Sequence, residues 1–235
     1  ILRWQEVDYA EGVNAAWWPR VEPDILRESV ATGKLAPVAD RVGPEPLVLQ
    51  GPETHPEYGG TWFRAALSLN DASTILYRMG TPNLVRWSEQ GHPIVPHLAR
   101  DFKVSEDKRI FTFYLRRGIH WSDGAPMDAN DLLYWWEKEA SDTRMRKIVP
   151  EVMRVGSAEG RVEKIDDYTV RFVFPVPNGL FLEKLASFRG IEVVSAPRHY
   201  LAPFHPYDGD ANQIAAEMER RQMPSPRALY RALKE

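Results

Sequence analysis

The chain has 235 residues, of which 43% are hydrophobic and 27% are charged, as expected for a folded globular protein and not for a disordered chain. The formal net charge is −3 and no run of lysine and arginine is present, which argues against binding to nucleic acid or to an anionic membrane surface. No apolar stretch approaches the ~20 residues that are needed to span a bilayer. Cysteine is absent, and this leaves the cellular compartment open.

Residues 1–57 contain few periodic elements, and we interpret them as an extended arm that lies on the rest of the chain. A short helix is expected within this arm, with Asp24 as its cap and Gly33 at its end. Five prolines follow within residues 35–60. Because proline fixes φ and removes a backbone donor, this part is expected to run extended over the surface.

The rest of the chain shows strand and helix patterns. Two segments have alternating apolar residues on either side of a short polar turn, at residues 106–108 and at Asp166–Asp167, and are therefore expected to form hairpins. Because both sets of alternating residues in 110–115 are largely apolar or aromatic, that strand is expected to be covered on both faces. A loop is expected at 88–102. The expected elements are strands at 61–69, 84–87 and 190–196, hairpins at 103–121 and 160–175, and helices at 179–188, 210–222 and 225–235.

The stretch HWSDGAPMDANDLLYWWE, residues 120–137, contains four acidic side chains that a hydrolase could use as acids and bases: Asp123, Asp128, Asp131 and Glu137. A structural interpretation covers the same residues. Gly124 suits a turn with positive φ, and Pro126 prevents the preceding strand from continuing. Asp128 and Asp131 have a spacing close to that of a helix capping box. The helix then presents one apolar face, formed by Leu132, Trp135 and Trp136.

No motif of a common catalytic or cofactor site is present. The chain lacks the G-x-G-x-x-G and G-x-x-x-x-G-K phosphate loops and the G-x-S-x-G elbow. Its six histidines show no H-E-x-x-H or H-x-H spacing, so neither a metal site nor a cofactor is expected. Two alternatives stay open at this point. One is a glycoside hydrolase with a carboxylate pair that includes Asp131 or Glu137. The other is an interaction module that docks a partner through Trp17-Trp18 of the arm.

Residues 84–137 contain, in this order, the segments LVRW, PHLA, TFYLRRG, WSDGAP and DAND. This order resembles the family-5 extracellular solute-binding proteins, the dipeptide- and oligopeptide-binding proteins of bacterial ABC importers. Downstream, VEKIDDYTVRFVFPVPN and VVSAPRHYLAPFHP are similar to the second hairpin of the family and to the loop after it. Upstream, LRESVATGKLAPVADRVGPEPLVLQ looks like the entry segment of a long-chain branch, so the resemblance covers about residues 26–207.

The resemblance implies an α/β fold of the type II periplasmic-binding architecture, with a mixed β-sheet flanked by helices and a smaller α+β subdomain at about residues 76–160. Residues 58–235 would form the N-terminal lobe, and the second, C-terminal lobe would lie outside this sequence. The implied function is to capture a peptide or similar solute, or an oligosaccharide, between two lobes and to deliver it to the permease of an ABC transporter. The implied protein is not an enzyme and needs no cofactor. It would be periplasmic or extracellular, with a lipoprotein anchor as a further hypothesis.

The resemblance also implies where a ligand would be bound. The candidates are polar residues after the first strand and one aromatic residue after the helix predicted at 179–188, namely Ser68, Asn70, Asp71, Thr74 and Phe188. The polar residues equally suit an ordinary turn, and the phenylalanine equally suits the core. One lobe leaves much of a ligand in water, whereas good small-molecule sites bury ~70–90% of it. This chain alone is therefore expected to bind solute poorly.

Overall fold

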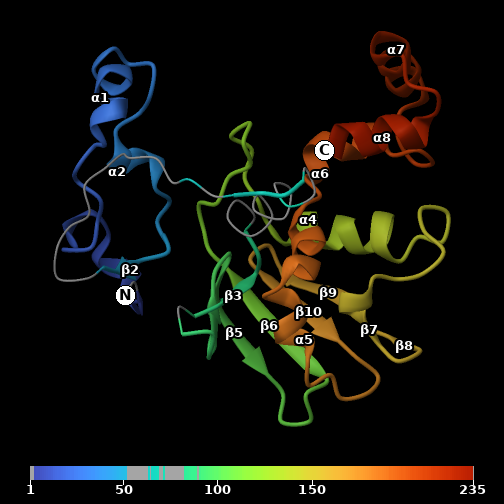
Figure 1. Cartoon of the computed structure of the whole chain (residues 1–235), viewed down its shortest axis with the longest axis horizontal. Helices are drawn as coiled ribbons and strands as arrows, with labels where there is room; N and C mark the ends of the chain where they lie inside the picture. Colours follow the sequence, from blue (N-terminus) through green and yellow to red (C-terminus); the bar gives the residue numbers. More distant parts are fainter. Residues whose placement is uncertain are drawn as a thin grey trace.

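A computed structural model of the chain describes residues 3–51, 63, 65–68, 71, 82–88 and 90–234. Its centre is a four-stranded antiparallel sheet with the strand order β5-β6-β10-β9. These strands are β5 (Ala99–Val104), β6 (Ile110–Leu115), β9 (Arg161–Asp166) and β10 (Thr169–Val173). The helices of the second half of the chain lie on and above this sheet, while the N-terminal residues lie to the side of β5 (Figure 1). The α/β class predicted from the sequence is confirmed.

One face of the sheet forms the core. The alternate residues of β6 and β10, among them Phe111, Phe113 and Phe172, are at most 3% exposed. Phe181, the first residue of α5 (Phe181–Leu185), packs on these rings, with its centroid 4.7 Å from that of Phe111 and 5.1 Å from that of Phe172. The prediction that both faces of β6 are covered is wrong for the outer face, where Ile110 is 37% exposed. Burial on one face only is what the alternation of an antiparallel strand permits.

The predicted hairpins are confirmed. The β5–β6 turn includes Lys108, which adopts a left-handed φ of 54°, and the β9–β10 hairpin turns after Asp166. The strand predicted at 84–87 is β3 (Val85–Trp87). The loop predicted at 88–102 is partly wrong. It contains the short strand β4 (Ile94–Pro96), which pairs antiparallel with β3, and its last residues, from Ala99, belong to β5. Because of Pro93 and Pro96, the sequence pattern indicated a loop here. Proline is tolerated because β4 pairs with one strand only.

The strand predicted at 190–196 is wrong. These residues belong to η4 (Phe188–Val194), a 3₁₀ helix that begins after Ser187, whose Oγ accepts from the backbone N–H of Arg189. Gly190 lies so close to α5 that an added Cβ would be 1.9 Å from the carbonyl oxygen of Leu185. Val193 and Val194 of η4 are buried, so the apolar run reflects packing and not strand formation.

The aromatic helix of residues 120–137 forms as predicted at its start. It consists of α4 (Ala129–Tyr134) and continues without a break as η2 (Trp135–Ala140), one turn of π-helix. Asp128 is the N-cap, and its side chain and that of Asp131 form the reciprocal bonds of a capping box. Trp135 is fully buried, and α4 contacts β9 and β10.

The last part of the chain is helical, as predicted. Asp210 caps the helix that begins at Ala211, and Ser225 Oγ accepts from the backbone N–H of Ala228 at the start of the last helix. The helices after η4 are α6 (Arg198–Leu201), η5 (Ala202–Phe204), α7 (Ala211–Arg221) and α8 (Pro226–Lys234). The α7–α8 pair extends away from the sheet (Figure 1). Before β9 lie η3 (Glu151–Met153), β7 (Arg154–Val155) and β8 (Ala158–Glu159). Within the described part of the chain, no helix has the length and hydropathy of a membrane span.

Residues 3–51 contain more structure than an extended arm. Their elements are β1 (Arg3–Trp4), η1 (Tyr9–Asn14), α1 (Asp24–Ala31), α2 (Val38–Arg41) and β2 (Leu49–Gln50). Two expectations are therefore wrong. Pro23 and not Asp24 is the N-cap of α1, and α2 interrupts the run that was expected to be extended. The limits 1–57, 58–235 and 76–160 stay predictions. Of the strand predicted at 61–69, residues 61, 62, 64 and 69 lie outside the described residues, and the described residues of that segment do not form a strand.

Arg116 attaches these N-terminal residues to the sheet. It is 3% exposed, and its guanidinium donates to the His97 carbonyl oxygen and the Tyr9 hydroxyl, each over 2.6 Å. The same group donates to the carbonyl oxygens of Glu45 and Pro46, over 3.2 and 3.0 Å. Tyr9 also packs on Trp17, and Trp17 on Trp18. Since Trp18 is only 9% exposed, the tryptophan pair packs inside the chain and does not form an open docking surface.

Candidate functional site

The polar turn that was predicted to face a ligand is described in part. Asn70 and Thr74 lie outside the described residues, whereas Ser68 and Asp71 are exposed. The backbone N–H of Asp71 donates to Ser68 Oγ over 3.4 Å, and the backbone N–H of Leu67 donates to Asp71 Oδ2 over 3.0 Å. Both side chains thus stabilise their own turn, as short polar residues commonly do. Their exposure leaves them accessible to a ligand, and that role stays a prediction.

Phe188 is 67% exposed, so the interpretation of this residue as core is wrong. It begins η4, and Asn83 holds the turn before it by donating Nδ2–H to the Ser187 carbonyl oxygen over 3.0 Å. The Arg189 guanidinium lies 4.8 Å from the centre of the phenylalanine ring and donates to Glu151 over 2.9 Å. The result is a flat, exposed ring in a fixed loop. Among the described residues, no hydrogen bond or ion pair joins this loop to the polar turn.

The acidic residues of the aromatic helix are structural. Asp131 is 6% exposed, and its Oδ2 accepts from Trp121 Nε1 and from the backbone N–H of Asp128, both over 3.1 Å. Its Oδ1 accepts from the backbone N–H of Arg198 over 2.8 Å. Both oxygens are therefore occupied, while Glu137 is exposed on η2. A glycosidase needs two carboxyl groups that face one substrate, and this arrangement does not provide them.

The turn before this helix holds an exposed hydrogen bond between a carboxylate and an imidazole. Asp123 Oδ2 lies 2.7 Å from His199 Nε2, and Asp123 Oδ1 accepts from the backbone N–H of Ala125. The hydrogen bond with His199 is the main reason that the pKa of Asp123 lies below its usual range. Asp123 thus links the WSDG turn to α6, and its carboxylate stays charged at neutral pH.

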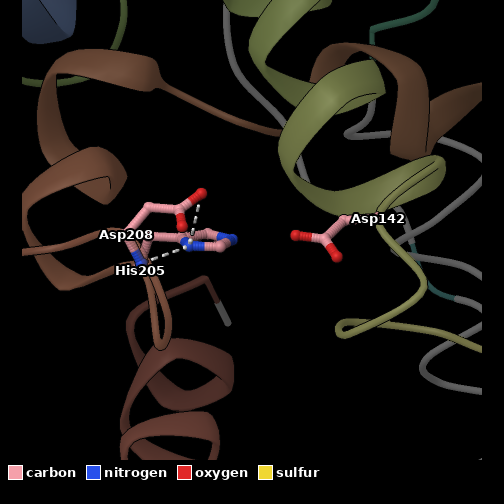
Figure 2. Close-up of side chains that lie close together, drawn as sticks. All are labelled: Asp142, His205 and Asp208. Carbon is pink, nitrogen blue, oxygen red and sulfur yellow. Dashed lines mark hydrogen bonds and ion pairs between the residues drawn. The ribbon is translucent and has the colours of Figure 1, made fainter.

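Asp142, His205 and Asp208 form a cluster that the sequence did not suggest, because Asp142 is far in the chain from the other two. One potential metal-binding atom from each lies within 4.8 Å of the others (Figure 2). The Arg144 guanidinium donates to both carboxylates, and Lys138 donates to Asp208 over 2.8 Å. His205 Nδ1 accepts from the backbone N–H of Asp208, so Nε2 donates to the Lys138 carbonyl oxygen.

Two cations therefore already neutralise this cluster, and both imidazole nitrogens are occupied. The hydrogen bonds from Arg144, and then from Lys138, hold the pKa of Asp208 well below its usual range. A divalent ion would have to displace these bonds against the charge of Arg144 and Lys138. The cluster is best understood as a structural connection between η2 and the loop after η5. It supplies no metal site.

Two shallow hollows share Arg100 and Tyr114 on the outer side of the sheet, with volumes of about 460 and 510 Å³. Their cations are already engaged. Arg100 pairs with Glu45 over 3.0 Å, and the Arg117 guanidinium lies 4.7 Å from the centre of the Tyr168 ring. Asp166 lines one of them, and the backbone N–H of Tyr168 lowers the pKa of its carboxyl group, which is the opposite of what a general acid requires.

Comparisons with known proteins identify relatives that bind solutes. The family model described as "Bacterial extracellular solute-binding proteins, family 5 Middle" matches residues 93–217. A periplasmic alpha-galactoside-binding protein of Rhizobium meliloti is 31% identical over 176 residues, which are 65% of this chain and 25% of the relative. A dipeptide-binding protein of Escherichia coli is 30% identical over 130 residues, which are 49% of this chain and 24% of the relative.

A solved structure agrees with these relatives. The oligopeptide-binding protein OppA superposes with a TM-score of 0.75 at 34% identity, and the match covers 94% of this chain and 34% of OppA. The chain thus spans about a quarter of the length of the curated relatives and a third of OppA. The predicted resemblance and the prediction that the chain is not an enzyme are confirmed. Because the family model matches more than half of the chain, this protein belongs to the bacterial extracellular solute-binding proteins of family 5.

Proposed function

We propose that this chain forms the first lobe of the solute-binding component of a bacterial ABC importer. The observation that carries the proposal is the match to OppA, which covers nearly all of this chain but only a third of that receptor. A lobe of this kind presents one wall of a ligand cleft. A second lobe closes over the solute by hinge motion, and no covalent bond is made or broken.

The exposed residues of this wall would contact the solute. Ser68 and Asp71 offer a hydroxyl and a carboxylate on a turn that their own hydrogen bonds stabilise. Phe188 offers an exposed ring whose position is fixed by the bond between Asn83 and Ser187. Together they suit a polar solute that carries hydrogen-bond donors and one flat or apolar part. Asn70 and Thr74 complete the proposed set from the sequence.

A peptide is the solute that we favour. The chain is 34% identical to OppA over 94% of its length, and 30% identical to the dipeptide-binding protein over a shorter part. The exposed carboxylate of Asp71 would suit the ammonium group of a peptide. An oligosaccharide is the second candidate, because the relative that binds alpha-galactosides is 31% identical over 176 residues. An exposed phenylalanine ring can stack on a sugar ring as well as on a peptide side chain.

Calorimetric titration of a longer chain that includes a second lobe tests this proposal. We expect saturable heat with dipeptides or oligopeptides, and no measurable heat when this 235-residue chain is titrated with the same ligands. Phe188→Ala in the two-lobe protein should weaken binding about tenfold, the equivalent of ~1.4 kcal/mol. Ile148→Ala is the matched control, because Ile148 is 65% exposed and lies outside the proposed wall. If only alpha-galactosides bind, the solute is a sugar and not a peptide. Tight binding of a peptide or an alpha-galactoside by this chain alone would contradict the two-lobe mechanism.

The partner and location follow from the same proposal. A closed receptor delivers its solute to the permease of the importer, and this requires a position on the outer side of the cytoplasmic membrane, in the periplasm or outside the cell. The relative that binds alpha-galactosides is described as periplasmic. Release of the native protein by osmotic shock would support a free periplasmic form, and retention in the membrane fraction would support a lipoprotein. Recovery with the cytosolic proteins would contradict both.

A further inference from the structure

A pocket that none of the predicted ligand residues lines opens between three segments that are distant in the sequence. Its volume is about 340 Å³, near the lower end of the ~300–1,000 Å³ typical of small-molecule sites. The β3–β4 hairpin, the β5–β6 hairpin and the start of α5 form its walls. The β5–β6 turn lies at the end of the sheet opposite to α6 and α8 (Figure 1).

The walls of this pocket are mainly apolar and aromatic. Trp87 is 40% exposed and Val104 is 39% exposed, although both have large apolar side chains. The other apolar residues of the lining are Pro93, Ile94, Phe102, Phe111 and Leu182. Exposed apolar side chains that gather around one hollow indicate a place where an apolar group is bound.

Two opposite charges lie at the same pocket. Lys108 and Glu183 both line it, and within the part of the chain that the structure describes neither side chain makes an ion pair or a hydrogen bond. This distinguishes them from the many charged residues of the chain that pair with a neighbour, such as Lys138 with Asp208. An unpaired ammonium and an unpaired carboxylate beside an apolar hollow are complementary to a zwitterion.

Asn178 adds a third polar group. It is 3% exposed, and its Nδ2 has no hydrogen-bond acceptor among the described residues. Its backbone N–H donates to the Lys108 carbonyl oxygen over 2.8 Å, so the two residues are neighbours in the lining of the pocket. A buried amide donor without an acceptor costs about 1–3 kcal/mol. An anionic ligand group held by Lys108 would lie next to this donor.

We propose that this pocket binds a free apolar amino acid at a site separate from the solute cleft. The carboxylate of the ligand lies toward Lys108 and Asn178, its ammonium group lies toward Glu183, and its side chain packs on Trp87 and Leu182. The small volume suits a single residue and excludes a longer peptide. The site is independent of the proposed cleft, because none of its residues belongs to the polar turn or to the η4 loop.

Calorimetric titration of this chain with L-leucine and L-phenylalanine tests the proposal. We expect saturable binding, and about tenfold weaker binding after either Lys108→Gln or Glu183→Gln, as for the loss of one charge-assisted contact. N-acetyl-leucine and leucinamide each lack one of the two charges of leucine, so each should also bind about tenfold more weakly. The matched control is Glu219→Gln, an exposed glutamate on α7. Val104→Trp should abolish binding by filling the pocket.

Other outcomes would overturn the proposal. If neither amino acid gives heat, or if both charge variants bind as well as the original chain, the assignment is wrong. If Phe188→Ala removes the binding, the ligand lies at the cleft wall and not in this pocket. If light scattering shows a dimer that Val104→Trp converts to a monomer, the pocket is occupied by a second copy of the chain. Circular dichroism of each variant confirms that a loss of binding is not a loss of fold.

Discussion

Replacing Asp131 with asparagine tests whether the acidic cluster of the aromatic helix is structural. Asparagine has one side-chain oxygen in place of two. If that oxygen takes the place of Oδ2, the bonds from Trp121 and Asp128 are kept, but the amide NH₂ then faces the backbone N–H of Arg198. One charge-assisted bond is lost and one buried donor has no acceptor, which together cost about 1.5–3 kcal/mol. The lost charge at the helix start adds about 0.5 kcal/mol.

The assay is urea unfolding followed by far-ultraviolet circular dichroism. With a loss of about 2–3.5 kcal/mol and a slope near 3 kcal/mol/M, the midpoint should fall by about 0.7–1.2 M. Asp128→Asn is the matched control, because asparagine and aspartate are equally good N-caps and the midpoint should move by less than ~0.2 M. Glu137→Gln, at an exposed position on η2, should also leave it unchanged.

The refuting result is equally specific. If Asp131→Asn and Asp128→Asn unfold at the same urea concentration, the three hydrogen bonds of Asp131 do not stabilise the fold. A buried carboxylate without a structural role would then need another explanation, and an acid–base function would have to be reconsidered. Retained solute binding by a stable Asp131→Asn variant would instead support the separation of this residue from the ligand site.

Three further predictions concern other parts of the chain. Arg116→Met should destabilise the fold by about 2–4 kcal/mol, because it leaves buried acceptors unpaired, and should expose the N-terminal residues to trypsin. Arg117→Met, at an exposed position, should cost less than about 1 kcal/mol in the same urea assay. Burial raises the pKa of Tyr134 from 10.0 to about 12. The contribution of the neutral phenol to stability is therefore complete below pH 10 and lost as the pH rises to about 12. Ultraviolet absorbance of tyrosinate measures this ionisation. Hydrogen bonds from two arginines lower the pKa of Glu217 from 4.5 to about 2. The stability that this carboxylate gives α7 is therefore complete above pH 4.5 and lost as the pH falls toward 2. An NMR titration should follow this loss, and Glu217→Gln should abolish the pH dependence.

Features that depend on neighbouring residues were predictable from the sequence. The two hairpins follow from alternation around a polar turn, and the start of the aromatic helix follows from the spacing of Asp128 and Asp131. In each case the groups that form the hydrogen bonds lie within a few residues of one another. The sequence therefore contains nearly all of the information that these elements need.

Features that depend on packing were missed. The segment at 190–196 has the β-branched residues of a strand, but η4 forms because Val193 is buried and Gly190 meets the backbone of Leu185. That contact joins residues on two elements, and no local propensity reports it. The strand β4 was missed for a related reason, since its pairing with β3 outweighs the unfavourable prolines at its ends.

The candidate sites divide in the same way. The resemblance supplied the polar turn and Phe188, but only the fold shows that this ring is exposed and that Asn83 holds its loop. The pocket near Trp87 could not have been found from the sequence, because its lining comes from three segments that the sheet and α5 bring together. The same is true of the cluster around His205, whose partners the fold alone supplies.

Six carboxyl groups of the described chain are kept in the charged form by hydrogen bonds. A general acid at neutral pH needs a carboxyl group whose pKa is raised, commonly by burial away from positive charge. Among the described residues, every carboxyl group with a resolved shift has a lowered pKa, and the largest cause in each case is a hydrogen bond. Such groups remain anions from mildly acidic to alkaline pH. They can accept hydrogen bonds, but they have no proton to donate at neutral pH, so none of these six groups suits the role of a general acid.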